Sequence, residues 1–500
     1  MVISECAKHS VVVGSGIGGL SIALLLAWSG RRVTLLEKLP RIGGFLQRFH
    51  RGGVAFDTGF HFTGGFDNVL PQMLEVLGLD DVVKEAPFRS RIYFGSSERR
   101  LELPEGGIEA LAEYLGREFP RDRDRIAAYY RAEKEVIEQT PMFDLRDADP
   151  GGKLLLGEFD LMTVDDFFAA HGIGGELGGA LASAAMCHGT PPCEASMTHH
   201  CRVSYGLGNH IARVERGGDA FIDGFNREAR KLGIESRTGC TISRIEARDS
   251  RRESHRVFLT DGSEMEFDDA FLTIHPQAIL EMMPEEVRRG VLGRRVAGME
   301  ESCSFFSIFG VVEPGVAVVP ELTSFISSPD LNRILLPGGG ERGIGMVTSC
   351  EHDEAGREVK TFTAFGSTFF DSVRRWAESG RDAGYASYKE EECGRLLEAV
   401  YRVYPEYSGR LRIAAASSPL TCRDYSPPTG CAYGVRQKIG EPRLFGRLPV
   451  RNFYALGQSA LIPGVLGTMM ASFLLFRQVV GEACYMRLIG RKLNCRRSFC

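Results

Sequence analysis

The sequence predicts an α/β fold in which a Rossmann-like nucleotide-binding domain is combined with an interrupted α+β domain. Two observations predict it: a glycine-rich turn between a strand and a helix near the N-terminus, and a second such turn near the C-terminus. The composition, 43% hydrophobic and 25% charged, suits an ordinary folded chain of 500 residues. Because the second turn is too short to build its own sheet, we expect both ends of the chain to share one domain.

The N-terminal turn has the pattern of a dinucleotide-binding unit. Val11 to Val13 form a β-branched run, and the sequence GSGIGG follows at residues 14–19, before an apolar helix and a second strand over 33–36. Gly14 permits the tight turn, Gly16 lets a pyrophosphate approach the backbone, and Gly19 lets the helix pack closely. Glu37, at the end of the second strand, can accept hydrogen bonds from ribose hydroxyls. An acid here also opposes a 2′-phosphate, and therefore NADP.

The stretch VVVGSGIGGLSIALLLAWSGRRVTLLEKLPRIGG resembles the extended FAD fingerprint of the phytoene desaturase and amine oxidase flavoproteins, of the GR2 type. The resemblance implies FAD as the cofactor. It also implies a set of cofactor-binding residues in this stretch: Gly14, Gly16, Gly18, Gly19, Glu37, Lys38, Gly43 and Gly44. Phe45 stands where many relatives have a basic residue after the second glycine pair.

The C-terminal turn resembles the second flavin motif of the same superfamily. NFYAL (452–456) predicts a strand, Gly457 and Gln458 follow it, and a helix is expected from about Thr468. The resemblance implies that Gly457 and Gln458 contact the ribityl chain, although many relatives have Asp in place of Gln458. It further implies a helix start under the flavin, at Gly464, Val465, Leu466 and Gly467, whose N–H groups would stabilise the charge of the reduced ring.

A middle segment resembles the part of the family that reaches the adenine. Gly217 and Gly218 are expected to open a helix, and Ile242 lies on the strand after it. The predicted FAD-binding domain therefore combines residues 1–75, 205–290 and 410–500. The predicted substrate-binding domain combines residues 76–204 and 291–410.

The sequence FDTGFHFTGG (56–65) resembles the retinol saturase and carotenoid isomerase branches, as does TCRDYSPPTGCAYG (421–434). This resemblance implies an oxidoreductase or isomerase that acts on carbon–carbon double bonds of a polyene or isoprenoid lipid, by hydride exchange with flavin N5. His61 is the expected catalytic group, because the ordinary pKa of histidine suits a proton donor near neutral pH. The alternative is that His61 packs the flavin loop.

Two other functions stay open on the same fold. A flavin amine oxidase is one, and a non-catalytic escort protein for prenyl lipids is the other. Rab escort proteins and GDP-dissociation inhibitors, which resemble this fold, have a degenerate nucleotide motif, whereas Gly14, Gly16, Gly19 and Glu37 are all present here. The GIGGELGG stretch at 172–179 has no preceding strand and predicts a loop or a helix start, not a second nicotinamide-binding turn. The electron donor or acceptor is therefore unknown.

Charge and cysteine usage narrow the partners and the location. The net charge is −5, and no basic run is interleaved with aromatic residues, which argues against nucleic acid. Thirteen cysteines without a CxxC pair indicate free thiols and a cytoplasmic location. No transmembrane span is predicted. The C-terminal cations suggest peripheral docking on an anionic membrane, with a solvated helix and frayed tail as the alternative: Arg477, Arg487, Arg491, Lys492, Arg496 and Arg497, against Glu482.

The stretch CHGTPPCEASMTHHC (187–201) resembles a metal site in composition only. Its spacing does not fit that of structural zinc ligands, so no metal is expected. Thr190 and Pro191 predict a helix start, with the helix running through His199 toward Tyr205. We expect Cys187, Cys193 and Cys201 to be apolar wall residues of a lipid tunnel. His199 or His200 would be the polar contact for a substrate headgroup.

Overall fold

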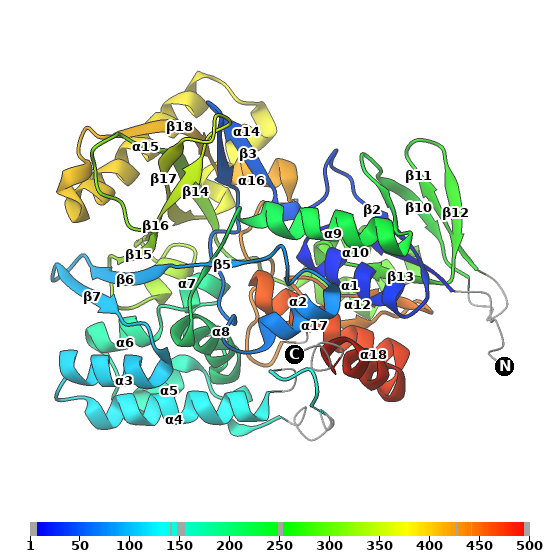
Figure 1. The fold of residues 1–500 in the computed structure, drawn as a ribbon, viewed down its shortest axis with the longest axis horizontal. Helices are drawn as coiled ribbons and strands as arrows, with labels where there is room; N and C mark the ends of the chain where they lie inside the picture. Colours follow the sequence, from blue (N-terminus) through cyan, green and yellow to red (C-terminus); the bar gives the residue numbers. More distant parts are fainter. Residues whose placement is uncertain are drawn as a thin grey trace.

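A computed structural model describes residues 8–140, 143–147, 156–248, 254–426, 428–441 and 443–494. Two large sheets organise the chain, one at each side of the molecule (Figure 1). In the described ranges no helix is both long and apolar enough to cross a membrane.

The first sheet is six-stranded and mostly parallel, with strands from distant parts of the chain. The order is β19 (Gly446–Arg447), β20 (Phe453–Ala455), β13 (Asp269–Leu272), β1 (His9–Val13), β2 (Arg32–Leu36) and β9 (Glu235–Arg237). β1 is central because its apolar run is buried on both faces, as a parallel strand between helices requires. The strand expected over 452–456 is confirmed as β20, and it places both chain ends in this sheet.

Three helices cover this sheet: α1 (Ile17–Trp28), α9 (Gly218–Leu232) and α17 (Gly464–Val480). α1 is apolar on all sides because it lies between the sheet, α9 and α17. α17 begins at Gly464, four residues before the expected Thr468, since Gly464 adopts a φ of 79° that starts the helix directly after Pro463. α18 (Glu482–Asn494) packs beside α17 and α2 (Val69–Leu77).

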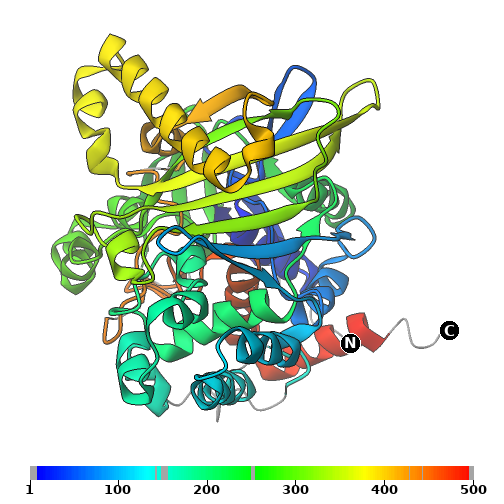
Figure 2. The same ribbon diagram turned by 90° about the vertical axis from the view of Figure 1, so that its left-hand side faces the viewer.

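The second sheet is seven-stranded, and its long strands cross the view in Figure 2. The order is β18 (Leu411–Ser417), β14 (Ser304–Val312), β17 (Glu358–Thr368), β16 (Gly343–His352), β15 (Glu321–Ile326), β6 (Arg89–Phe94) and β7 (Arg99–Leu103). β18 follows residue 410, where the nucleotide-binding part was expected to resume, but pairs with β14.

Alternation along β14 gives this sheet two different faces. Phe306 and Ile308 pack with Leu396 and Val400 of α15 (Ala383–Val403) in one apolar cluster. Their neighbour Phe305 points to the opposite face, which lines a large cavity. The sheet is therefore a wall with α15 behind it and the cavity in front.

A layer of helices lies below this sheet (Figures 1 and 2). Its members are α3 (Gly107–Glu118), α4 (Arg123–Gln139), α5 (Val164–His171), α6 (Gly175–Leu181), α7 (Ala185–His188) and α8 (Met197–Asn209). The glycine-rich stretch at 172–179 enters α6, so of the two expected structures, a loop or a helix start, the helix start is observed.

The remaining elements are short or peripheral. The strands are β3 (Arg48–Arg51) with β4 (Val54–Asp57), β5 (Glu85–Ala86) with β8 (Arg213–Val214), and β10 (Ile242–Glu246) with β11 (His255–Leu259) and β12 (Glu264–Phe267). The helices are α10 (Pro276–Met282), α11 (Glu285–Arg289), α12 (Val291–Ala297), α13 (Asn332–Leu335), α14 (Arg374–Ser379) and α16 (Pro419–Tyr425).

Candidate functional site

A cavity of about 1250 Å³ runs between the parallel sheet, the seven-stranded sheet and α8. The predicted site residues that line it are Gly14, Gly16, Gly18, Glu37, Lys38, Gly43, Gly44, His61, Ile242, Gly457, Gln458, Gly464, Val465, Leu466 and Gly467. Gly19 lies outside the lining, and a Cβ there would be 1.9 Å from the Gly14 carbonyl oxygen. Gly19 thus allows α1 to approach β1, which is the packing role expected of it.

The two N-terminal glycine pairs meet at one end of this cavity. The Gly43 N–H donates to the Ser15 carbonyl at 3.0 Å and to Ser15 Oγ at 3.1 Å. A Cβ on Gly44 would lie 3.1 Å from Gly16 Cα, so both loops pass close to each other. A Cβ on Gly16 itself would meet no protein atom within 4 Å, although the residue lies in a packed loop. The loops therefore leave an open cradle in front of the helix N-terminus, as a pyrophosphate requires.

Glu37 is buried and serves the loop as well as the cavity. Its carboxylate accepts hydrogen bonds from the Ser15 N–H at 3.0 Å, the Ser15 hydroxyl at 2.5 Å and the Leu39 N–H at 2.9 Å. An ionised carboxylate has about four acceptor positions, so a place is left for a ribose hydroxyl. The neighbouring Lys38 has its pKa lowered, chiefly by burial.

The C-terminal motif meets the same loops. A Cβ on Gly18 would lie 2.9 Å from Thr468 Cγ2, and Ser472 Oγ donates to the Gly18 carbonyl at 3.2 Å. Gly457 has a φ of 115° and lies against Thr273, whose hydroxyl bonds the Val13 and Gly14 carbonyls. Thr273 was not predicted as a site residue, although it directly follows a buried parallel strand, where α/β folds bind ligands.

An aromatic row forms the other part of the cavity. His61 stacks on Phe365 with ring centres 5.5 Å apart and planes at 7°. Phe365 contacts Phe305 edge to face at 5.2 Å, and Phe305 contacts Tyr433 at 5.9 Å. All four rings line the cavity. Only His61 was predicted, because the other rings come from β14, β17 and a loop that tertiary register brings together.

His61 differs from expectation in its electrostatics. Burial lowers the pKa of His61 to about 4, while Asp57 opposes this shift. The imidazole is therefore neutral at neutral pH, and the expectation of a pKa near the working pH is wrong. Its stacking on Phe365 makes it part of the aromatic wall.

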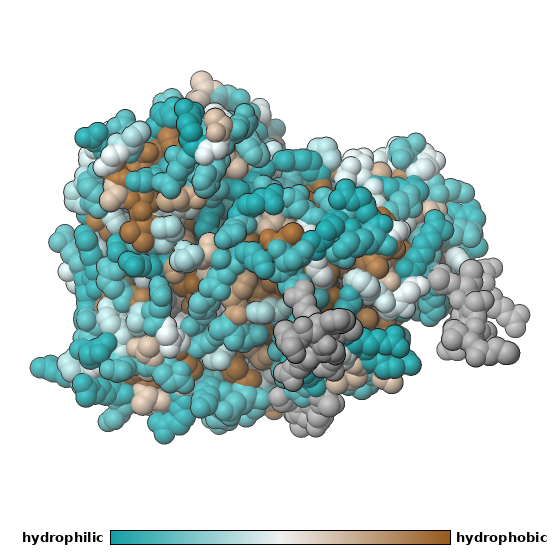
Figure 3. Space-filling view, in the orientation of Figure 1, coloured by the Kyte–Doolittle hydropathy of each residue, from teal (hydrophilic) through white to brown (hydrophobic). Residues whose placement is uncertain are grey.

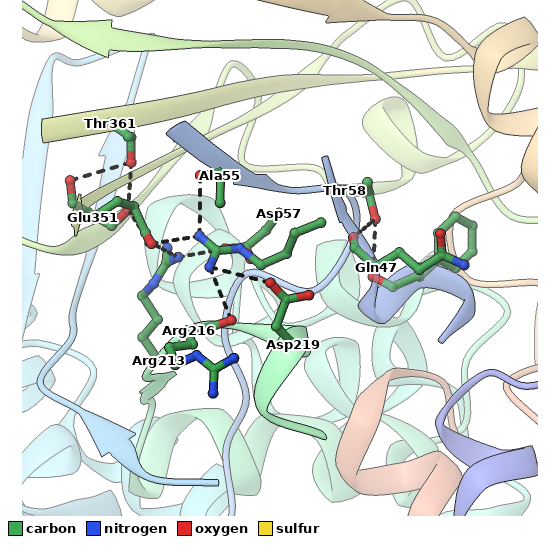
Figure 4. A network of polar contacts seen from close by, with 12 residues as sticks. Gln47, Ala55, Asp57, Thr58, Arg213, Arg216, Asp219, Glu351 and Thr361 are labelled. Carbon is green, nitrogen blue, oxygen red and sulfur yellow. Dashed lines mark hydrogen bonds and ion pairs between the residues drawn. The ribbon is translucent and has the colours of Figure 1, made fainter. Parts of the chain in front are cut away.

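A buried ion-pair network holds the loop that carries His61 (Figure 4). Asp57 pairs with Arg48 at 2.9 Å and with Arg213 at 2.6 Å. Glu351 of β16 pairs with the same two arginines at 2.6 and 2.7 Å. The arginines are less than 10% exposed, so each buried charge is met by an opposite one. The network joins the β3–β4 hairpin and β8 to the seven-stranded sheet.

The segment 187–201 is arranged differently from the prediction. α8 begins at Met197 with Ser196 as its N-cap, whose Oγ accepts the His199 N–H at 3.1 Å. The helix start expected at Thr190 and Pro191 is wrong, because the Thr190 hydroxyl instead accepts the Gln437 N–H at 2.9 Å.

The three cysteines of this segment lie in different environments. Cys187 lines the cavity and Cys201 is fully buried, so an apolar environment fits both. Cys193 is exposed, and its place in a tunnel wall is therefore wrong. His188 and His200 form a hydrogen-bonded pair at 3.2 Å between Nε2 and Nδ1.

A second group with metal-ligand chemistry lies at His275, Glu301 and Cys431, whose ligand atoms are within 4.8 Å of one another. His275 Nδ1 accepts the Gln277 N–H at 3.2 Å, which places the imidazole hydrogen on Nε2, 3.2 Å from Glu301 Oε1. Burial raises the pKa of Cys431, so its thiol stays protonated. His275 therefore caps α10 through Nδ1, and its Nε2 lies beside Glu301 without forming a hydrogen bond.

Comparison with known proteins agrees with this geometry. The family model of flavin-containing amine oxidoreductases matches residues 17–300. The all-trans-retinol 13,14-reductase of Danio rerio is 24% identical over 519 residues, covering 92% of this chain and 84% of that protein. The carotenoid 3,4-desaturase of Haloarcula japonica is 25% identical over 297 residues, covering 56% and 58%.

Among solved structures, an oxidoreductase from Methanosarcina mazei superimposes with a TM-score of 0.63 at 14% identity, covering 94% of this chain and 100% of that one. Its likeness shows the fold. Because the family match spans more than half of the sequence, the chain belongs to the flavin-containing amine oxidoreductases and is an FAD-dependent oxidoreductase.

Proposed function

We propose that this enzyme acts on carbon–carbon double bonds of a polyene or isoprenoid lipid, in the direction of saturation, desaturation or isomerisation. The observation that carries the proposal is the continuity of one cavity from the glycine cradle to the aromatic row of His61, Phe365, Phe305 and Tyr433. A conjugated chain is flat and apolar, and aromatic walls fit it. The similarity to a retinol reductase and a carotenoid desaturase supports the same substrate class.

We propose that FAD is held by the predicted residues around the cradle. Gly16 and Gly44 would admit the pyrophosphate, Glu37 the ribose, and Ile242 the adenine end. Gly457 and Gln458 would face the ribityl chain, and the N-terminus of α17, over Gly464–Gly467, would stabilise negative charge on the ring. Bound FAD supplies hydride exchange at N5. The protein supplies position and a water-poor wall, and His61 contributes to that wall as a neutral ring.

The chemistry of the cavity disfavours an amine as substrate. Among the lining residues from 186–207 and 303–367, Arg202 is the only charged one within the described chain. A cationic amine would be bound beside an acid, and the lining acids Glu37, Glu281 and Glu285 lie in the nucleotide-binding part.

The test uses purified holoenzyme. A flavin absorbance spectrum is expected, together with a change in polyene absorbance when all-trans-retinol or a carotene is added to the reduced or oxidised enzyme under anaerobic conditions. Hydrogen peroxide release with amines and no change of any polyene would contradict the proposal and favour an amine oxidase.

We also propose peripheral attachment to anionic membranes through α18. Its exposed cations are Arg487 and Arg491, and its surface in Figure 3 is mainly hydrophilic. Two of the C-terminal cations make contacts within the protein and do not face solvent freely. Arg477 is buried and pairs with Glu482 at 2.5 Å, and Lys492 lies on the Trp28 ring. Arg496 and Arg497 lie outside the described residues. Co-sedimentation with phosphatidylserine vesicles, lost in Arg487→Glu/Arg491→Glu, would support attachment, and no co-sedimentation of the wild type would contradict it.

A further inference from the structure

One residue of the cavity lining, Arg202, belongs to a cluster of cationic and imidazole groups that the proposed hydride chemistry does not use. Its members are His199, Arg202 and Arg443. We propose that this cluster, here named the polar end, binds the carboxylate of a lipid acid, so that the substrate is a polyene or unsaturated acid and not a neutral alcohol or hydrocarbon. This inference rests on the function proposed above.

α8 directs the polar end toward the cavity. Arg202, Val203, Gly206 and Leu207 of this helix line the cavity, and His199 lies one turn before Arg202 and Val203 on the same face. At Gly206, an added Cβ would be 3.3 Å from Leu466 of the C-terminal flavin motif. The rise of an α-helix places Arg202 about 6 Å from Gly206 along the axis. The polar end is therefore about one helical turn from the flavin-motif end.

Most hydrogen-bond donors of the polar end have no partner among the described residues. Arg202 donates from Nε to Thr140 Oγ1 at 2.9 Å, and its two terminal nitrogens have no partner among the described residues. The Arg443 guanidinium has no hydrogen bond or ion pair within the described ranges either. His199 is 1% exposed, and neither Nδ1 nor Nε2 has a hydrogen-bond partner there. A buried polar group without a partner costs free energy, which a ligand would recover.

The charges of the polar end favour an anion. Burial, followed by the charge of Arg202, lowers the pKa of Arg443 to about 10, and burial lowers that of Arg202. Both guanidinium groups remain protonated at neutral pH. Asp160 is the acid that opposes both shifts, but it lies beyond 4 Å of either guanidinium and accepts the Gly157 N–H. The cluster therefore carries excess positive charge beside an apolar cavity.

A carboxylate matches this set of donors. An arginine binds a carboxylate through two parallel N–H···O bonds, and a neutral imidazole adds one donor. An alcohol offers one oxygen and no charge, so it would leave at least one cation without a partner.

The experiment compares two ligands with the same polyene chain. All-trans-retinoic acid and all-trans-retinol are titrated into the holoenzyme, with the flavin absorbance change as the readout. We expect the acid to bind at least tenfold more tightly than the alcohol. In Arg202→Met, acid binding should weaken tenfold to a hundredfold while alcohol binding changes less than threefold. Arg202→Lys should restore part of the acid affinity.

Arg131→Met is the matched control, because Arg131 is exposed on the neighbouring helix α4. It should leave both affinities unchanged. Equal binding of acid and alcohol by the wild type, or equal weakening of both in Arg202→Met, would overturn the carboxylate site and leave the proposed function intact. A flavin-loaded wild type that neither binds nor converts any polyene would overturn the proposed function itself.

Discussion

Two buried clusters of arginine in this molecule have opposite balances of charge. Around Asp57, two arginines meet two carboxylates, and each guanidinium reaches both acids at 2.6–2.9 Å. Around His199, Arg202 lines the cavity, and neither Arg202 nor Arg443 has a carboxylate within 4 Å among the described residues. Buried charges that are paired within the chain hold elements together. Those left without a partner beside a cavity mark a place for a ligand.

Removing an acid from the paired cluster should have the largest effect on stability. In Asp57→Asn, two buried arginines lose one of their two counter-charges, so we expect the free energy of unfolding to fall by about 3–5 kcal/mol. Chemical denaturation measures this. The control Asp223→Asn breaks the exposed Arg216–Asp223 pair and should cost less than about 1 kcal/mol. Similar losses in both variants would mean that the buried acid stabilises the fold no more than the exposed one.

The glycine cradle is, like the polar end, a space that the chain leaves open, so filling it should affect the ligand and not the fold. Gly16 has a φ of −65°, which valine tolerates, and a Cβ there meets nothing. We expect Gly16→Val to weaken FAD binding more than a hundredfold, while the unfolding free energy of the FAD-free protein changes by less than about 1 kcal/mol. Gly394→Ala, also at an open position, is the control. A normal FAD content in purified Gly16→Val would mean that the pyrophosphate does not lie against Gly16.

Glu133 of α4 is a buried acid without a cationic partner among the described residues, so it is the acidic counterpart of the polar end. Burial raises its pKa to about 8. A raised pKa means that its contribution to stability is fully present below the unfolded value near 4.5 and is lost as the pH rises toward 8. Glu133→Gln should therefore be more stable than the wild type by about 3 kcal/mol at pH 7, and equal to it near pH 4.

Thermal unfolding between pH 4 and pH 8 measures this difference. Glu135→Gln, on the exposed side of the same helix, should show no such trend. A stability difference for Glu133→Gln that does not depend on pH would mean that Glu133 is ionised in the folded protein.

Substitution of His61 should have the smallest effect, and that effect is on turnover. Because its pKa is about 4, we expect turnover to be independent of its titration between pH 6 and 8. His61→Phe keeps a ring against Phe365 and should retain turnover within about tenfold. A rate that rises as the pH falls through 6.5, or a hundredfold loss in the variant, would identify His61 as a proton donor after all.

The sequence predicts the nucleotide-binding part well because its signals are local. A buried strand, glycines at fixed spacing and a following helix lie within thirty residues, and every predicted cofactor residue except Gly19 lines the cavity. The start of α8 was missed since Thr190 and Ser196 both have capping side chains, and a backbone group of Gln437 takes the hydroxyl of Thr190. The residues around Thr190 do not predict its contact with Gln437, which is distant in the sequence.

The rest of the site depends on contacts between distant segments. Phe305 and Phe365 face the cavity through the pairing of β14 with β17, in which Phe305 lies opposite Ser367 and Phe365 opposite Ser307. Arg48 and Glu351 are 303 positions apart and meet only in the folded protein. The excess of positive charge at the polar end could not be predicted from the sequence either, because no motif surrounds Arg202 or Arg443.

The central sheet has a consequence for how the protein is made. β20 completes the sheet beside β13, and α17 covers α1 through the bond from Ser472 to Gly18. A ribosome delivers β1 and α1 long before α17, so α1 lacks one of its covering helices while the segments between them are synthesised. The nascent chain therefore exposes one of its most apolar helices until α17 emerges. Truncation before residue 464 should yield protein that depends on chaperones and aggregates.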